Sequence, residues 1–101
     1  MSRLRWSHRA RRDLIAIGKY IAQDDPVRAR RWVSRLRERA RTAAAMPLSG
    51  RRVPAMEQDD LREVLVRGYR IVYRVFEEET HVLTVFEGHR LFPSAAILED
   101  E

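Results

Sequence analysis

Two strand patterns joined by a glycine constrain this fold most. Residues 61–75 read LREVLVRGYRIVYRV, with Gly68 between the two runs. Because strand side chains alternate between faces, one face of the second run carries Tyr69, Ile71, Tyr73 and Val75. The other face carries Arg70, Val72 and Arg74. This pattern predicts an antiparallel hairpin that buries its tyrosine face and offers arginines to an anionic partner. The alternative is an ordinary solvent-facing sheet surface.

Two helical stripes precede these strands. The first helix is predicted over residues 8–23, with Ser7 as its N-cap and apolar residues at spacings of three and four. Asp25 and Pro26 have the pattern of a second helix start, in which a carboxylate caps the helix and proline takes its first position. An apolar stripe follows at Ala29, Val33, Leu36 and Ala40. The short join predicts a helical hairpin.

The rest of the chain completes an α+β domain. Residues 3–6 alternate as a short first strand, and residues 46–60 have turn and breaker residues. A polar loop at 77–80 leads to a third strand of the sheet's main part at 82–86. The predicted order is β-α-α-β-β-β, a helical hairpin packed on a small, mainly antiparallel sheet in a single domain over residues 1–101. The helical hairpin is expected to cover the sheet face that carries Tyr69. The opposite face, which carries Arg70 and Arg74, is therefore expected to stay available for binding.

Charge and composition narrow the function classes. The formal net charge is +5 with a pI near 10.6, and 19 of the 20 basic residues are arginine, whose planar fork suits phosphate or carboxylate. The sequence has no cysteine, which excludes disulfides and thiolate metal sites. It has neither an apolar run of the roughly 18 residues that span a bilayer nor a signal-peptide core. We therefore expect a cytoplasmic protein without a membrane partner.

No familiar catalytic motif is complete in this sequence. The three histidines lack metal-site spacing, and no metal or other cofactor is predicted. Cationic phosphodiester chemistry remains, with Arg70, Arg74 and Arg90 on the phosphate and His89 as the proton-transfer group. The second helix adds two arginine clusters, one at Arg28, Arg31, Arg35 and Arg39 and one at Arg30, Arg37 and Arg41. These clusters are either a solvated face or a surface for a polyanion or an acidic partner.

A series of short motifs resembles the RelE/ParE superfamily of toxins from type II toxin–antitoxin systems. The pieces run in order over nearly the whole chain: Asp13-Leu14-x-x-Ile17-x-x-Tyr20-Ile21-Ala22, Asp25-Pro26-x-x-Ala29, Pro47-x-x-Gly50-Arg51-x-Val53-Pro54, Leu61-Arg62-Glu63, Gly68 to Val75, Leu83 to Phe86 and Gly88-His89-Arg90. The Asp25–Pro26 junction and the loop from Gly50 to Pro54 are more similar to the ParE branch. The resemblance implies the same sheet-and-hairpin fold.

The resemblance also implies partners. A cognate antitoxin is expected, with an acidic toxin-binding segment and a DNA-binding domain through which the pair reaches its operator. DNA gyrase is the expected target of a ParE-like toxin, which poisons it by protein contact and needs no active site. The target- or antitoxin-binding surface is predicted at Arg31, Arg35, Arg62, Arg67, Arg70, Arg74 and Arg90.

Two alternatives stay open within the superfamily. The first is a RelE-like, ribosome-dependent mRNA endonuclease. Arg70 and Arg90 match two of that branch's arginine positions, but Leu61 and Glu63 stand where its best-known pattern has lysines. No tyrosine follows Arg90, so His89 would have to move the proton. The second is an inactive toxin fold that only binds antitoxin.

Overall fold

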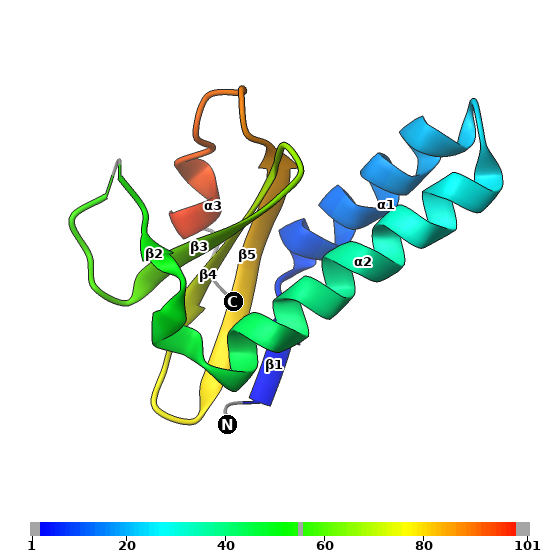
Figure 1. Ribbon diagram of the computed structural model, residues 1–101. Coiled ribbons are helices and arrows are strands. Elements are labelled where there is room, and N and C mark those ends of the chain that lie inside the picture. The colour runs from blue at the N-terminus through cyan, green and yellow to red at the C-terminus, as the bar shows by residue number, and fades with distance from the viewer. Residues whose placement is uncertain (1–2, 55, 99–101) are drawn as a thin grey trace.

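A five-stranded sheet with a helical hairpin on one face forms the body of the molecule (Figure 1). The computed structural model describes residues 3–54 and 56–98. Its elements are β1 (Arg3–Trp6), α1 (His8–Ala22), α2 (Pro26–Ala45), the 3-10 turn η1 (Pro47–Ser49), β2 (Arg51–Arg52), β3 (Leu61–Val66), β4 (Tyr69–Val75), β5 (Glu79–Glu87) and α3 (Ala95–Leu98). The predicted α+β class and the order of its main elements are confirmed. No helix in the described ranges has the length and apolar character to cross a membrane.

Polar side chains set the starts of both long helices. The Ser7 hydroxyl accepts a hydrogen bond from the Ala10 amide at 3.0 Å and donates one to the Leu83 carbonyl at 3.0 Å. The same residue therefore caps α1 and fastens it to β5. Asp25 caps α2 by accepting from the amides of Val27 and Arg28, both at 3.1 Å. Both predicted caps are confirmed.

The sheet has the strand order β1-β5-β4-β3-β2, in which β1 pairs with β5 in parallel and the other pairs are antiparallel. The turn between β3 and β4 is Arg67–Gly68, with φ of 41° and 88°. Two successive residues in the left-handed region suit the right-handed twist of a two-residue hairpin. The predicted strand pair around Gly68 is confirmed.

The helical hairpin buries the tyrosine face of β4. Ile71 and Tyr73 are buried together with Leu14 of α1 and Leu36 of α2, and Tyr69 packs at the edge of this cluster. We call this set the helix-side core. It confirms the predicted contact between the helix stripes and the sheet.

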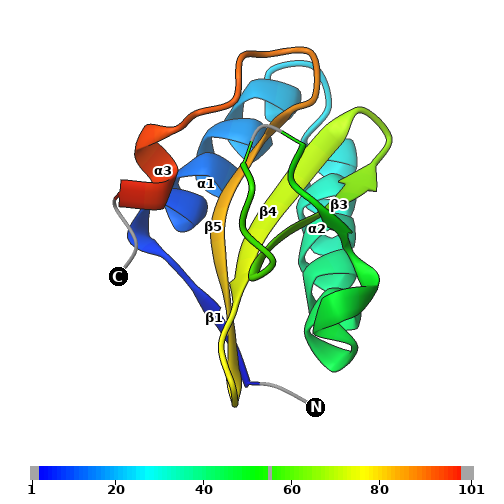
Figure 2. The same cartoon turned by 90° about the vertical axis from the view of Figure 1, so that its left-hand side faces the viewer.

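The opposite sheet face is not left open, and this part of the prediction is wrong. A second cluster, the far-side core, buries Val53, Leu61, Val72 and Leu83. Met56, Phe86, Phe92 and Ile97 pack against it, so the loop before β3 and the chain after β5 cover this face (Figure 2). The physical reason is that this face carries the apolar residues Leu61, Val72 and Leu83. Their burial away from water stabilises the folded state.

Three further differences arise from pairing between distant segments. β5 begins at Glu79 instead of at the predicted residue 82, because Glu79 and Thr80 pair with Arg3 and Leu4 of β1. The predicted loop over residues 77–80 is therefore too long. β2 lies inside the predicted irregular stretch, where Arg51 and Arg52 pair with Glu63 and Arg62. α3 was not predicted; it lies beside β5 in the tail of the chain.

Candidate functional site

Arg70 is held by a buried carboxylate on the far side of the sheet. Its Nε and one terminal nitrogen donate to Glu63 Oε1 at 2.8 and 2.5 Å, and Arg51 Nε donates to the other oxygen, Oε2, at 2.5 Å. The Glu63 side chain is fully buried, and that of Arg70 is 15% exposed. Both carboxylate oxygens therefore have an arginine donor.

Two aromatic rings enclose the same guanidinium. The Arg70 Cζ atom lies 5.0 Å from the Phe86 ring centre and 5.6 Å from that of Phe92. The two rings meet edge to face, with their centres 5.9 Å apart. Cation–π attraction and the ion pair both favour this position. Arg70 thus has partners on several sides within the fold.

Two more of the predicted site arginines also have internal partners. Arg74 donates to Asp60 Oδ2 at 2.8 Å, and its side chain is 15% exposed. Arg62 donates to the backbone carbonyls of Asp59, Gly50 and Leu48 at 2.8 to 3.3 Å, and so ties η1 and the loop to β3. These contacts give both residues a role in holding the fold.

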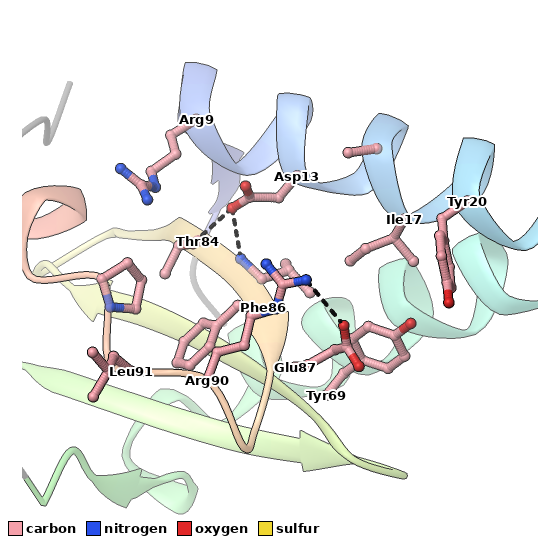
Figure 3. A pocket seen from close by; sticks show the side chains of 13 residues that line it. Arg9, Asp13, Ile17, Tyr20, Tyr69, Thr84, Phe86, Glu87, Arg90 and Leu91 are labelled. Carbon is pink, nitrogen blue, oxygen red and sulfur yellow. Dashed lines mark hydrogen bonds and ion pairs between the residues drawn. The ribbon is translucent and has the colours of Figure 1, made fainter.

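A cleft of about 430 Å³ lies between α1, the end of β5 and the chain that follows it (Figure 3). Asp13 is one of its lining residues, and its Oδ2 accepts from the Thr84 hydroxyl at 2.6 Å and from the Val85 amide at 3.0 Å. Tyr20 and Tyr69 line the same cleft. Burial raises the pKa of Tyr69, and the negative charge of Glu87 raises it further.

Arg90 and His89 lie beside Glu87, just after β5, and neither pairs with the carboxylate that holds Arg70. Arg90 lines the cleft, its side chain is 69% exposed, and its guanidinium lies 3.5 Å from Glu87. His89 is 76% exposed, with Nδ1 3.9 Å from Glu87. Glu87 thus faces both residues, whereas the carboxylate of Arg70 is Glu63. In the described ranges no hydrogen bond or ion pair joins Arg70 to Arg90 or His89, although Phe86 both lines the cleft and lies against the Arg70 guanidinium.

The remaining predicted residues lie on the outside of the molecule. Arg31 and Arg35 are exposed on α2, where the Arg35 guanidinium lies 5.7 Å from the Trp32 ring centre. Arg67 is exposed at the tip of the β3–β4 hairpin. Each is placed where a partner could reach it.

Sequence reasoning missed two residues of this region. In the sequence, Glu63 stands out only as a departure from the nuclease pattern, whereas in the structure it is the partner of Arg70. The two-residue turn carries the missing signal, since it pairs Leu65 with Arg70 and so puts Glu63 on the face of Arg70. Asp13 reaches β5 across 71 residues of sequence, and no local pattern indicates that contact.

Comparison with known proteins places the chain in a family. A profile described as "ParE toxin of type II toxin-antitoxin system, parDE" matches residues 4–92. The chain belongs to the ParE toxin family. A Putative toxin Y4kP of Sinorhizobium fredii is 37% identical to it over 93 residues, covering 90% of this chain and 93% of that protein. Toxin RelE2 of Caulobacter vibrioides is 37% identical over 92 residues, covering 90% of this chain and all of the relative.

Solved structures share the fold of this ParE family member. The match to a chromosomal ParDE toxin–antitoxin system from P. aeruginosa has a TM-score of 0.72 at 23% identity and covers 86% of this chain and 96% of the other. A toxin–antitoxin complex RelBE2 from Mycobacterium tuberculosis gives 0.61 at 22% identity, covering 85% and 96%. A mutant E. coli toxin RelE in the free state gives 0.64 at 17% identity, covering 97% and 92%. The predicted RelE/ParE toxin fold is confirmed.

Proposed function

We propose that this chain, as the toxin of a type II toxin–antitoxin system, inhibits growth by poisoning DNA gyrase through protein contact. A cognate antitoxin neutralises it with an acidic segment and carries the DNA-binding domain that recognises the operator. The match to the ParE family profile supports the gyrase branch. The ParDE and RelBE2 structures, which carry the same fold, support the antitoxin partner.

The observation that carries the choice of target is the Glu63–Arg70 ion pair. Metal-independent cleavage of a phosphodiester needs cations at the phosphate and a proton-transfer group within hydrogen-bond reach. Here the Arg70 guanidinium already binds a buried carboxylate between two aromatic rings. A phosphate would have to compete with Glu63 in a site closed by Phe86 and Phe92. This arrangement favours a protein inhibitor over a nuclease.

The position of His89 adds to the same conclusion. Its side chain is exposed and lies near Glu87, whereas Arg70 is bound by Glu63. A proton shuttle and a phosphate-binding arginine must meet the same scissile bond. The exposed members of the predicted binding set, Arg31, Arg35, Arg67 and Arg90, are instead suited to contact an acidic protein surface.

The test is a gyrase assay with purified toxin. We expect loss of DNA supercoiling and accumulation of gyrase-cleaved linear DNA, with both effects reversed when the toxin is first mixed with the antitoxin from the neighbouring reading frame. Intact supercoiling without cleaved DNA, at toxin in excess over gyrase, would contradict the proposal. A parallel primer-extension assay on ribosome-bound message covers the nuclease alternative. Cuts that depend on the toxin and on Arg90 would favour that alternative.

A further inference from the structure

The outer surface of α2 carries a dense and largely unneutralised row of arginines. The helix has 20 residues, of which seven are arginine and one, Glu38, is acidic. Glu38 pairs with Arg41 at 2.9 Å. Within the described ranges, no carboxylate forms an ion pair with the other six: Arg28, Arg30, Arg31, Arg35, Arg37 and Arg39. Of the seven, only Arg39 is half-buried; the rest are exposed.

This arrangement works against the helix itself. Like charges three or four residues apart face each other on a helix and destabilise it. Arg28 and Arg31 have such a spacing, as do Arg31 and Arg35. Arg37 and Arg41 are also four apart. A bound polyanion would convert this repulsion into attraction.

The arginines divide into two flanks on either side of a ridge that has no arginine. At 100° per residue, Arg30, Arg37 and Arg41 lie within about 40° of one another, and Arg28, Arg31 and Arg35 within about 60°. The centres of the two flanks are about 130° apart. Between them lie Val27, Ser34 and Ala45, which are small and exposed, and the internally paired Glu38. The ridge residues are exposed, and the Arg30, Arg37 and Arg41 flank borders a groove between α2 and α1. The sheet packs on the opposite side of α2 (Figure 1).

We infer that α2 binds duplex DNA by placing this ridge in the major groove. A helix is about 10–12 Å across and the B-DNA major groove is about 12 Å wide, so arginines on both flanks meet the phosphates of the two strands. The cationic stretch from Arg28 to Arg41 is about 20 Å long, or about six base pairs. The binding follows the phosphates, so it is weakly selective for sequence.

This inference departs from the expectation that DNA is reached only through the antitoxin. It adds a DNA contact made by the toxin chain. Free toxin on a short duplex tests it without gyrase or antitoxin. The gyrase proposal and the DNA proposal can therefore fail separately.

Fluorescence anisotropy on a random-sequence 24-base-pair DNA, titrated from 50 to 300 mM NaCl, measures the contact. The arginines that are exposed and have no carboxylate partner, Arg28, Arg30, Arg31, Arg35 and Arg37, predict a log–log slope of affinity against salt of about −4.5, at about 0.9 per phosphate. The variants R30Q/R37Q and R31Q/R35Q, one for each flank, should each reduce the magnitude of this slope by about 2 and weaken binding at least about tenfold at 100 mM salt. All four positions are exposed. Circular dichroism and thermal unfolding will verify that the variants fold.

A charge-matched variant separates a site from net charge. R3Q/R5Q removes two exposed arginines from β1, the strand at one edge of the sheet, and should leave the slope nearly unchanged. Equal weakening by R3Q/R5Q and the α2 variants would overturn the inference, as would no binding at 50 mM salt. Duplex RNA of the same sequence should bind less tightly, because its major groove is too deep and narrow for side chains to read. Equal affinity for RNA would overturn the groove placement.

Discussion

At the scale of single residues, Glu63 is the most consequential position. A carboxylate removed from water is costly unless charged partners and hydrogen bonds compensate it. Arg51 and Arg70 supply both kinds of compensation, and Phe86 and Phe92 close the site around Arg70. The side chain that departs from a nuclease pattern thus also organises the far side of the sheet.

Replacing Glu63 by glutamine keeps the size of the side chain but removes its charge. The change should destabilise the fold by about 3 kcal/mol, because the buried Arg70 charge loses its counterion. The free energy of unfolding, from urea titration at pH 7, measures this loss. Asp59→Asn is the matched control, since it removes a carboxylate from the exposed pair with Arg52. That change should cost no more than about 0.5 kcal/mol. Equal losses from the two variants would contradict the assigned role of Glu63.

Two tyrosines make stability sensitive to alkaline pH. Burial raises the pKa of both Tyr69 and Tyr73 above the usual value near 10. The folded state therefore favours the neutral phenol. This contribution is fully present below pH 10 and is lost as the pH rises through the folded-state pKa.

The urea midpoint should accordingly fall as the pH is raised from 9 to 11. In Tyr69→Phe/Tyr73→Phe that fall should be smaller, although the variant is less stable at neutral pH because the Tyr73 hydroxyl no longer donates to the Pro47 carbonyl. Tyr20→Phe serves as the control, because Tyr20 is 72% exposed. An unchanged pH profile in the double variant would show that these tyrosines do not cause the alkaline loss.

At the scale of elements, the sequence predicted those features that depend only on neighbouring residues. The caps of α1 and α2 and the turn at Arg67–Gly68 each depend on a few neighbouring residues, and all three appeared where the sequence indicated. β2 and the start of β5 depend on partners far along the chain, so their own residues show little strand character. The burial of the Arg70 and Arg74 face was missed for the same reason, since the side chains that cover it, such as Met56 and Phe92, come from other segments.

The N-cap of α2 tests whether neighbouring residues alone fix the start of this helix. Asp25→Ala should destabilise the protein by about 1 kcal/mol, because the amides of Val27 and Arg28 lose their acceptor. Asp24→Ala is the control at the adjacent position, with the same change of charge but no cap to remove. Thermal or urea unfolding measures both variants. If Asp24→Ala were as costly, the loss would come from charge near the helix start and not from the cap.

At the scale of the whole molecule, the sheet separates two hydrophobic cores and contributes residues to both. Leu36 and Tyr73 lie in the helix-side core, and Leu83 and Val72 lie in the far-side core. Alternate residues of the same strand β4 enter the two cores. A disturbance on one side should therefore reach the other.

Phe92→Ala tests this coupling. It removes a ring that contacts Arg70 and Phe86, and it should cost about 1–3 kcal/mol because Phe92 is only half-buried. Both tryptophans, Trp6 and Trp32, pack against the helix-side core and report on it by fluorescence. Tryptophan fluorescence and far-UV circular dichroism should shift to the same lower urea midpoint. Separate midpoints would mean that the two layers unfold independently; Leu91→Ala, at a 94% exposed side chain, is the unperturbed control.

The parallel pairing of β1 with β5 determines when the sheet can form during synthesis. β1 is synthesised before the other strands, but its partner β5 is synthesised after them. Likewise, the Ser7 hydroxyl can donate to the Leu83 carbonyl only after 76 further residues have been added. Translation proceeds at about 5–20 residues per second, so about 5–20 s pass before the sheet can close. Any surface that needs the finished sheet can form only after β5 has been synthesised. An antitoxin already translated by then would meet its partner at the moment of completion.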